Sequence, residues 1–456
     1  STPKPSSAAS DVYKRQAEYR AEVPLKYQIA CDGFILSVEG RADGIIELPK
    51  RVVIDEIKGV FKDLKRLKEP QLLHLAQAKC YAYIYAEQKN LEEIGVQMTY
   101  CNLDTEEIRR FQEVYTRAEL KKWFEELVSE YEKWARYQME WRAKRNASIK
   151  TVEFPFEYRD GQKKLVASVY RTILRKKKLF IQAPTGVGKT MAAVFPAVKA
   201  VGEELGEKIF YLTAKTITRT VASQAFEILR KQDLKMKVIT LTAKEKICFC
   251  EETICNPDAC PYAKGHFDRV NAAVYELLTS TDEMSREVLE EQARKWNVCP
   301  FEMALDVSTW VDGVICDYNY VFDPDARLRR FFAEGGAGGY LFLIDEAHNL
   351  VDRAREMYSA VMSMTELTHA RHAVEDKAVD RRLVTYMDRS ILAMSALRES
   401  SDESCQLMGN IGSLIVYLTK LSEQLEETLK EGVIAPLREV LMEFYFDIRR
   451  FICAFD

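Results

Sequence analysis

The sequence predicts an α/β protein built from two α/β domains and a helical region. Short apolar runs alternate with helical segments between residues 154 and 350, which is typical of a parallel sheet covered on both faces by helices. Strand patterns surround one helix between residues 27 and 103, which predicts a separate, earlier α/β domain. From residue 351 onward the pattern is helical and charged, without a strand signal. Because 456 residues exceed one typical core of about 100–200 residues, we expect about two to four domains.

The composition is that of a globular chain, with 47% hydrophobic and 30% charged residues. The net charge of −4 identifies no nucleic-acid partner by itself, so such a partner must bind a local cluster of Lys and Arg. No apolar run approaches the roughly 20 residues that span a bilayer, and no secretory signal opens the chain. We therefore expect a cytoplasmic protein without membrane contact. Residues 1–16 are poor in apolar side chains, and we expect a disordered or non-native leader there.

The first domain is expected to span residues 17–150. Glycine-punctuated apolar stretches predict strands over residues 27–48 and 52–59, a helix from Pro70 to about Gln88, and a further strand over residues 94–103.

A long amphipathic helix is expected to follow, because Thr105 precedes acidic residues and an apolar periodic pattern that continues to about Arg145. A polar linker near residues 146–151 then closes the first domain. The second domain is expected over residues 151–350, and a helical third domain over residues 351–456.

A phosphate-binding loop is the clearest chemical motif of the second domain. The apolar stretch at residues 179–183 is followed by a glycine-rich loop and a predicted helix, which is the context that a P-loop requires. Gly186 and Gly188 permit backbone turns that aim N–H groups at phosphate oxygens. Lys189 supplies a positive charge to the β- and γ-phosphates of ATP, and the Thr190 hydroxyl ligates Mg²⁺.

A second motif, D-E-A-H, supports the same chemistry. Asp345 and Glu346 follow an apolar strand pattern about 155 residues after the P-loop, which itself follows a predicted strand at residues 179–183. We expect the P-loop and these two acids to converge from adjacent strand tips of a single sheet. Asp345 is predicted to hold Mg²⁺ through water, and Glu346 to polarise the attacking water. His348 is predicted to couple the γ-phosphate site to a nucleic-acid site. A glycine loop that binds no ligand is the disfavoured alternative, because two motifs agree.

Cysteines crowd into one stretch at about residues 244–300, which interrupts the strand–helix alternation and is predicted to be an insertion. Four thiolates can hold a [4Fe–4S] cluster or a structural Zn²⁺, and spacing alone does not choose between them. Cys250 is an alternative for the first ligand. The predicted ligands are Cys248, Cys255, Cys260 and Cys299.

The first domain carries a pattern that fits a metal-dependent nuclease centre. Glu56 and Lys58 point to one face of a strand because side chains alternate, and Asp43 can meet them from a neighbouring strand. Two carboxylates bind Mg²⁺, which activates water, and a lysine orients the nucleophile or offsets phosphate charge. Gln77 and Tyr81 are spaced i, i+4 and share one helix face, where we expect DNA contact.

The second domain resembles superfamily-two helicases of the XPD/DinG type, through GVGKT, DEAHNL and the segment at residues 317–324. The resemblance implies a RecA-like motor domain and places an iron–sulfur domain at the cysteine-rich insertion. It also implies that residues 351–456 begin a helical arch domain, and that Thr213, Lys215 and Thr216 touch single-stranded DNA. The implied ATP-binding residues are Arg159, Gln162, Thr185, Gly186, Gly188, Lys189, Thr190, Asp345 and His348.

The first domain resembles the PD-(D/E)xK fold of RecB-type nucleases, because GxxD, ExK and QxxxY occur in the family's order. The resemblance implies nuclease activity in which Glu56 and Lys58 are catalytic. A catalytically inactive DNA-binding remnant is the alternative.

The sequence is thus interpreted as a bacterial ATP-dependent DNA helicase fused to a metal-dependent DNA nuclease, acting in DNA repair or processing. The resemblance implies 5′–3′ movement on single-stranded or forked DNA, with ATP, Mg²⁺ and a [4Fe–4S] cluster. The alternatives are a DNA-binding ATPase with an inactive nuclease remnant and a DEAH-type RNA helicase. No protein partner is identified. We expect the second motor domain to lie beyond Asp456 or to be missing, so that this chain binds nucleotide but hydrolyses it poorly.

Overall fold

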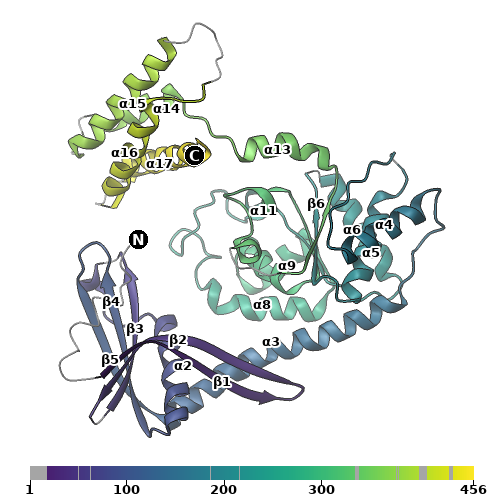
Figure 1. The fold of residues 1–456 in the computed structure, drawn as a ribbon, viewed down its shortest axis with the longest axis horizontal. Helices are drawn as coiled ribbons and strands as arrows, with labels where there is room; N and C mark the ends of the chain where they lie inside the picture. Colours follow the sequence, from purple (N-terminus) through teal and green to yellow (C-terminus); the bar gives the residue numbers. More distant parts are fainter. Residues whose placement is uncertain are drawn as a thin grey trace. The chain divides into compact units, whose positions relative to one another are not determined.

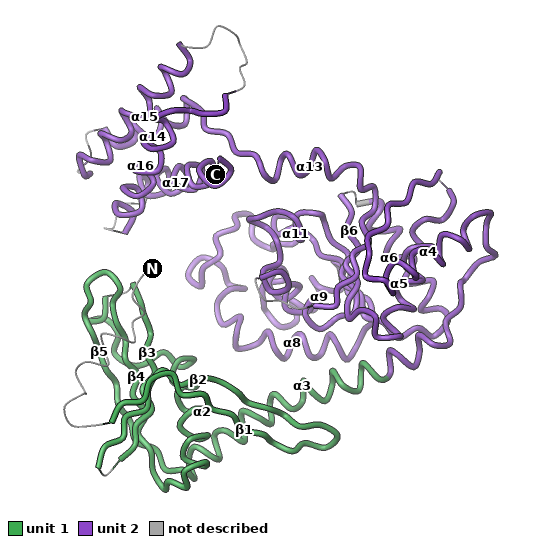
Figure 2. Tube along the Cα trace, in the orientation of Figure 1, with its two compact units in different colours: residues 1–143 green, residues 144–456 purple. Residues whose placement is uncertain are grey.

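The computed structural model describes the chain in two compact units, residues 1–143 and 144–456 (Figure 2). The expected leader at residues 1–16, together with Thr185 and Lys215, lies outside the described residues. The described residues are 18–49, 51–61, 63–184, 186–214, 216–333, 338–375, 377, 379–399, 408–430 and 435–455.

The first unit contains a five-stranded sheet in the order β1-β2-β3-β4-β5. Neighbouring strands are antiparallel except β3 and β4, which run parallel. Parallel strands need a crossover connection, and helix α2 supplies it between them (Figure 1). Its elements are β1 (Glu18–Cys31), β2 (Phe34–Leu48), β3 (Arg51–Val60), η1 (Leu64–Arg66), α2 (Leu72–Lys89), β4 (Glu93–Asn102), β5 (Ile108–Thr116) and the start of α3 (Arg117–Thr151).

The prediction of a helix from Thr105 is wrong. The segment forms strand β5, which pairs antiparallel with β4 over its whole length, and the helix begins only at Arg117. Phe111 and Tyr115 pack from β5 against the buried core of the unit. Cross-strand pairing and this packing override the helical pattern, because strand preference depends on tertiary context.

The second unit contains a parallel five-stranded sheet in the order β10-β6-β9-β7-β8. Helices α5 and α6 cover one face, where their apolar side chains share a core with β6, β9 and β7. The strands are β6 (Lys208–Leu212), β7 (Val238–Thr240), β8 (Glu283–Met284), β9 (Gly313–Cys316) and β10 (Tyr340–Ile344). The helices before and among them are α4 (Gln162–Leu174), α5 (Lys189–Gly202), α6 (Thr216–Arg230), α7 (Lys244–Ile247), α8 (His266–Ser280), α9 (Arg286–Trp296), α10 (Pro300–Trp310), α11 (Asn319–Phe322) and α12 (Arg329–Phe332).

The strand predicted just before the P-loop does not join this sheet. Residues 179–183 have no strand structure, and Phe180 is 89% exposed. Strand β10 pairs with β6 alone among the described strands, so its other edge carries no described partner. A segment becomes a strand only when its N–H and C=O groups pair with a neighbouring strand, and an apolar composition alone does not ensure that pairing. The expectation of adjacent strand tips for the P-loop and the acids is therefore wrong.

The last described turns of α3 belong to the core of the second unit. Ile149 and Val152 are 1% exposed within that core. Arg145 forms a buried ion pair with Asp312 at 2.8 Å. The Lys199 ammonium donates to the carbonyl of Ile149 at 2.8 Å, which caps the helix end. The chain therefore enters the second unit along a helix and not along the polar linker expected at residues 146–151.

The cysteine-rich stretch lies between β7 and β9 and folds as α7 to α10 with the short strand β8. Strand β8 pairs parallel with β7, so this stretch extends the sheet at its edge.

The remaining residues form a helical group with its own buried core, built mainly from leucines of the last four helices. The elements are η2 (Ala347–Asn349), α13 (Leu350–Met357), α14 (Met364–Ala373), α15 (Arg381–Glu399), α16 (Ser413–Lys430) and α17 (Ala435–Phe455).

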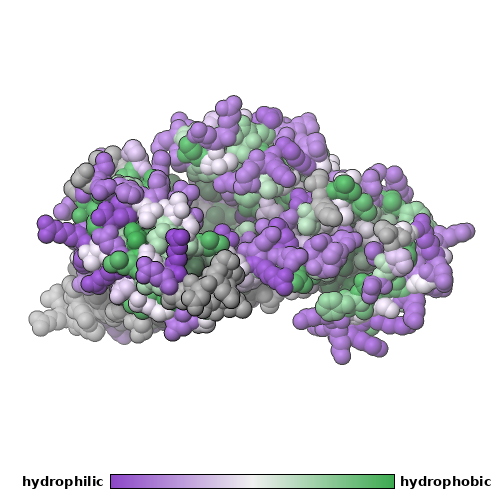
Figure 3. All heavy atoms as spheres, turned by 90° about the horizontal axis from the view of Figure 1, so that it is seen from above, coloured by the Kyte–Doolittle hydropathy of each residue, from purple (hydrophilic) through white to green (hydrophobic). Residues whose placement is uncertain are grey.

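The described part of the chain contains no helix long and apolar enough to cross a membrane. In the face drawn in Figure 3, hydrophobic atoms are interspersed among hydrophilic ones.

Candidate functional site

The glycine-rich loop has the backbone conformation that its glycines were predicted to permit. Gly186 and Gly188 have φ angles of +87° and +78°, a region that disfavours residues with a Cβ. Helix α5 begins at Lys189, so its N-terminal N–H groups face the loop. The Lys189 ammonium donates to the carbonyl of Ala183 at 3.0 Å. The loop and its lysine are thus ordered around a backbone oxygen, where a phosphate oxygen would compete.

Gln162 fastens the segment before α4 to this loop. Its side-chain amide donates to the carbonyl of Val187 at 3.0 Å and accepts from the backbone N–H of Arg159 at 3.1 Å. Gln162 is only 3% exposed, whereas the Arg159 side chain is exposed. Gln162 therefore positions the loop, and Arg159 is left open to a ligand.

The two acids of the second motif lie at the end of β10. The N–H of Asp345 donates to the carbonyl of Leu212 at 2.9 Å, which continues the ladder with β6 by one bond. At Glu346 the backbone turns with φ of +49°, a strained value for a residue with a side chain. His348 lies 3.4 Å from the Glu346 carboxylate and is largely exposed.

Tyr211 connects the P-loop to these acids. Its hydroxyl lies close enough to the Thr190 and Asp345 side chains for both to affect its pKa. Burial, followed by the neighbouring Asp345 charge, raises the pKa of Tyr211, so the hydroxyl keeps its proton. Burial and the neighbouring Glu346 charge raise the pKa of Asp345, and Lys189 opposes that rise. The structure thus brings together Thr190, Lys189 and Asp345, although by way of α5 and β6 and not through paired strands.

The residues expected to touch DNA after β6 are described only in part. Thr213 is 1% exposed, and its hydroxyl is hydrogen-bonded to that of Thr218 in α6. Its backbone N–H donates to the carbonyl of Cys316 at 3.0 Å. The Thr213 side chain is therefore engaged within the protein. Lys215 and the Thr216 side chain are not among the described parts.

The cysteines of the insertion approach one another without forming a complete metal site. The sulfurs of Cys250 and Cys260 are 3.8 Å apart, and Cys255 lies close enough to Lys244 to raise the pKa of that lysine. Burial raises the pKa of Cys299. Among the described residues, no three His, Cys, Asp or Glu side chains converge closely enough for a metal ion. Thiols are the ligands that an iron–sulfur cluster or Zn²⁺ requires, so the chemistry of these cysteines fits such a group.

The nuclease-like constellation lies where β2, β3 and α2 meet. Asp43 accepts from the N–H of Ile57 at 2.8 Å. The ammonium of Lys58 lies 2.7 Å from Glu56 and 3.1 Å from the amide oxygen of Gln77. The amide of Gln77 in turn donates to the Tyr81 hydroxyl at 3.2 Å. The structure therefore brings all five predicted residues, Asp43, Glu56, Lys58, Gln77 and Tyr81, into one neighbourhood.

Glu56 is the most perturbed acid of this group. Its side chain is 1% exposed, and one carboxylate oxygen has no hydrogen-bond partner. Burial raises the pKa of Glu56 to about 7, with a further rise from Asp43 and an opposing effect of Lys58. A buried carboxylate oxygen without a donor is an acceptor that a divalent cation would satisfy.

Asp55 has the opposite orientation, as the alternation of a strand requires. Its carboxylate accepts from the Thr99 hydroxyl at 2.6 Å and from the Gln97 amide at 3.0 Å, both on β4. The residue is 2% exposed. Asp55 is thus tied into the sheet, away from Glu56 and Lys58.

Two tyrosines of the motor site carry no role in the sequence-based interpretation. Tyr211 lies within the strand pattern before Thr213, and Tyr318 lies in the segment at residues 317–324. Tyrosine within an apolar run is usually a core residue, so the sequence offers only a weak signal.

Three family models match parts of the chain. The DEAD_2 model matches residues 213–367, and the DEAD/DEAH box helicase model matches residues 161–261. The PD-(D/E)XK nuclease superfamily model matches residues 6–148.

Curated relatives match over short stretches of their own length. A Fanconi anemia group J protein homolog of Gallus gallus is 30% identical over 142 residues, covering 31% of this chain and 10% of the relative. Regulator of telomere elongation helicase 1 of Mus spretus is 19% identical over 335 residues, covering 62% of this chain and 27% of the relative. This chain thus spans about a quarter or less of these proteins. Both relatives are animal proteins, so they lend no support to the expected bacterial origin.

Solved structures named XPD helicase and truncated XPD also match. The first is 18% identical, with a TM-score of 0.39, and the match covers 65% of this chain and 50% of that chain. The second is 18% identical, with a TM-score of 0.37, and the match covers 62% of this chain and 82% of that chain.

Proposed function

We propose that this chain, which matches the DEAD_2, DEAD/DEAH box helicase and PD-(D/E)XK nuclease superfamily models, belongs to an ATP-driven DNA helicase that also cuts DNA. The observation that carries the motor half is the position of Tyr211 beside both Thr190 and Asp345. The names of the curated relatives, a Fanconi anemia protein homolog and a regulator of telomere elongation, support work on DNA in repair or processing.

In the proposed ATP site, each side chain has a separate task. Lys189 leaves the carbonyl of Ala183 and pairs with the β- and γ-phosphates. The Thr190 hydroxyl would hold Mg²⁺ directly and the Asp345 carboxylate would hold it through water, and the ion would neutralise charge on the phosphates. Glu346 orients the attacking water, and His348 beside it senses the γ-phosphate.

In the proposed nuclease site, Asp43 and Glu56 hold a divalent metal ion, which activates water when it is bound. Lys58 orients that water or offsets charge on the scissile phosphate, and Gln77 fixes the position of the lysine. Tyr81 and Gln77 form the helix side of the site. The competing candidate is an inactive remnant, which is favoured by the existing engagement of Asp43 with a backbone N–H.

In the insertion, we propose that Cys248, Cys255, Cys260 and Cys299 hold a [4Fe–4S] cluster, with Cys250 as the alternative first ligand. The contact of Cys250 with Cys260 supports the alternative. Such a cluster would cross-link the insertion, which lies between two strands of the motor sheet.

The DNA assignment is tested by direct competition. Labelled single-stranded DNA is bound to the chain and displaced by unlabelled single-stranded DNA, forked DNA or RNA of the same sequence. We expect both DNA competitors to displace the label at lower concentration than RNA. Stronger displacement by RNA would favour an RNA helicase instead.

A further inference from the structure

Tyr318 holds the backbone that carries the two acids of the motor site. It follows β9, and its side chain is fully buried. Its hydroxyl donates to the carbonyl of Asp345 and, at 3.2 Å, to the carbonyl of Glu346. These two carbonyls belong to the residues proposed to hold magnesium and to orient water.

The turn formed by Asp345 and Glu346, the acid turn, needs such a donor because the chain leaves the sheet at this point. The N–H of Asp345 makes the last backbone hydrogen bond to β6 among the described residues, and Glu346 then adopts a left-handed backbone conformation. Carbonyls beyond the ladder must find other donors when they are buried. The carbonyl of Glu346 also accepts from the backbone N–H of Asn349 at 2.9 Å and from the Asn349 side-chain amide at 3.1 Å. The Tyr318 hydroxyl spans both carbonyls and so fixes the direction in which the two carboxylates leave the turn.

The neighbouring Asp317 anchors this tyrosine to two helices. One carboxylate oxygen lies 3.2 Å from Arg219 in α6, and the other lies 3.2 Å from Arg353 in α13. Arg353 also donates to the Asn319 side chain at 2.7 Å. A carboxylate between two guanidinium groups is a strong electrostatic anchor when it is half-buried, as here.

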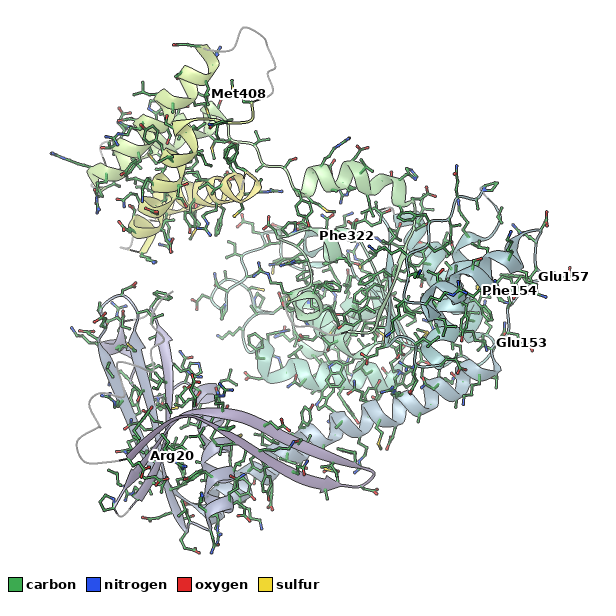
Figure 4. The ribbon with its side chains drawn as sticks, in the orientation of Figure 1. Arg20, Glu153, Phe154, Glu157, Phe322 and Met408 are labelled. Carbon is green, nitrogen blue, oxygen red and sulfur yellow. The ribbon has the colours of Figure 1, made fainter. Side chains whose placement is uncertain are left out.

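A further contact ties the end of this segment to the residues after the acids. The Tyr358 hydroxyl donates to the carbonyl of Phe322, the last residue of α11, at 3.0 Å. Phe322 is labelled in Figure 4. Helix α13 follows η2 directly, and η2 follows the acid turn. The residues after the acid turn are therefore hydrogen-bonded to the segment that begins at Asp317.

We infer that Tyr318 is a positioning residue for Asp345 and Glu346, held in place by Asp317 between α6 and α13. The inference rests on the proposed ATP site and adds to it a residue that touches neither nucleotide nor metal. Loss of the Tyr318 hydroxyl frees the acid turn, and the metal-dependent part of nucleotide binding then weakens.

The test compares Tyr318→Phe with Tyr320→Phe in the whole chain. The Tyr320 hydroxyl donates to the carbonyl of Thr242 at 3.3 Å, so the control removes a hydroxyl from the same segment without touching the acid turn. Binding of a fluorescent, non-hydrolysable ATP analogue is titrated with Mg²⁺ and again with EDTA. We expect Tyr318→Phe to weaken binding about tenfold in Mg²⁺ and to leave binding in EDTA unchanged, because loss of a supporting hydrogen bond typically reduces metal affinity by about 10–100-fold. Tyr320→Phe should match the wild type in both.

Three outcomes would overturn the inference, and they are distinguishable. If the wild type gains affinity from Mg²⁺ and both variants gain as much, Tyr318 does not position the acids, and the ATP site stands. If Tyr318→Phe weakens binding equally with and without Mg²⁺, its role is general stability. If the wild type gains nothing from Mg²⁺, the proposed ATP site fails and the inference fails with it. Should Tyr318→Phe not fold, Asp317→Asn replaces it, with the same Mg²⁺-specific loss expected.

Discussion

The ammonium group of Lys58 lies 2.7 Å from the carboxylate of Glu56, and the two residues differ in exposure, at 25% and 1%. Burial raises the pKa of Glu56 to about 7, and the hydrogen bond from Lys58 opposes that rise. The lysine therefore keeps the acid closer to the charged form that binds a metal ion, while its own exposed side remains open to substrate.

We predict that Lys58→Ala and Glu56→Gln each reduce Mg²⁺-dependent cleavage of single-stranded DNA by at least about a hundredfold, because each removes a group that acts on the water or the metal. Cleavage of an end-labelled oligonucleotide measures the loss. Lys121→Ala is the matched control, since Lys121 is an exposed lysine of the same unit with only a weak ion pair at 3.9 Å. An equally inert wild type, with nucleotide binding intact, would favour the remnant.

Cysteine variants distinguish the metal of the insertion. We predict that anaerobically purified chain is brown and contains iron, and that Cys260→Ser loses both the visible absorption and the iron. Cys316→Ser is the control, because Cys316 is fully buried within β9 and outside the insertion. Colourless wild-type protein containing zinc would contradict the iron–sulfur proposal and support the zinc alternative.

The same preparation separates Cys248 from Cys250. Because Cys250 is in contact with Cys260, we predict a larger loss of iron from Cys250→Ser than from Cys248→Ser if Cys250 is the first ligand. The reverse order would support the set predicted from the sequence.

Buried Lys208 provides a pH-dependent test of the motor core. Its ammonium donates to three backbone carbonyls near the end of α10, and burial lowers its pKa from 10.5 to about 8. The unfolded chain therefore binds one more proton between those values, and stability rises with pH across that window. We predict a gain of about 3 kcal/mol in unfolding free energy from pH 8 to 10.5 relative to Lys208→Met, at about 1.4 kcal/mol per pKa unit. Parallel pH profiles of wild type and Lys208→Met would contradict the shift.

The end of α3 tests where the motor domain begins. Ile149 is buried in the core of the second unit, where a Cβ at Gly202 would approach it to 2.5 Å. We predict that a fragment starting at Lys144 unfolds at higher denaturant concentration than one starting at Val152, because the shorter fragment leaves a cavity and exposes apolar surface. Equal midpoints in urea would show that these turns are dispensable and would favour the boundary predicted near residue 150.

Motifs with local chemistry could be predicted from the sequence, whereas contacts between distant segments could not. Gly186 and Gly188 were identifiable because the phosphate loop needs left-handed backbone at fixed spacing, and both residues have positive φ angles. Asp55 and Glu56 point to opposite faces, as strand alternation requires. Tyr211, by contrast, acts through residues on two other elements, and no spacing in the sequence indicates that contact.

The strand predictions were wrong where pairing with another strand determines the secondary structure. Residues 108–116 are a strand because β4 offers a ladder, although their pattern resembles a helix. Residues 179–183 are apolar enough for a strand, yet no described segment pairs with them. In both cases the presence or absence of a hydrogen-bonding partner strand determines the outcome, and the composition of a segment does not indicate whether such a partner exists.

The central claim is that Thr190 and Asp345 hold one magnesium ion together, and a double-mutant cycle measures it most directly. Calorimetric titration with a non-hydrolysable ATP analogue gives the Mg²⁺-dependent gain in affinity for wild type, Thr190→Ala, Asp345→Asn and the double variant. Two residues that hold one ion, Thr190 directly and Asp345 through water, are strongly coupled, so we predict that each single variant loses most of the gain and that the double variant loses little more. Losses that add independently, or a full gain retained by Asp345→Asn, would contradict the claim.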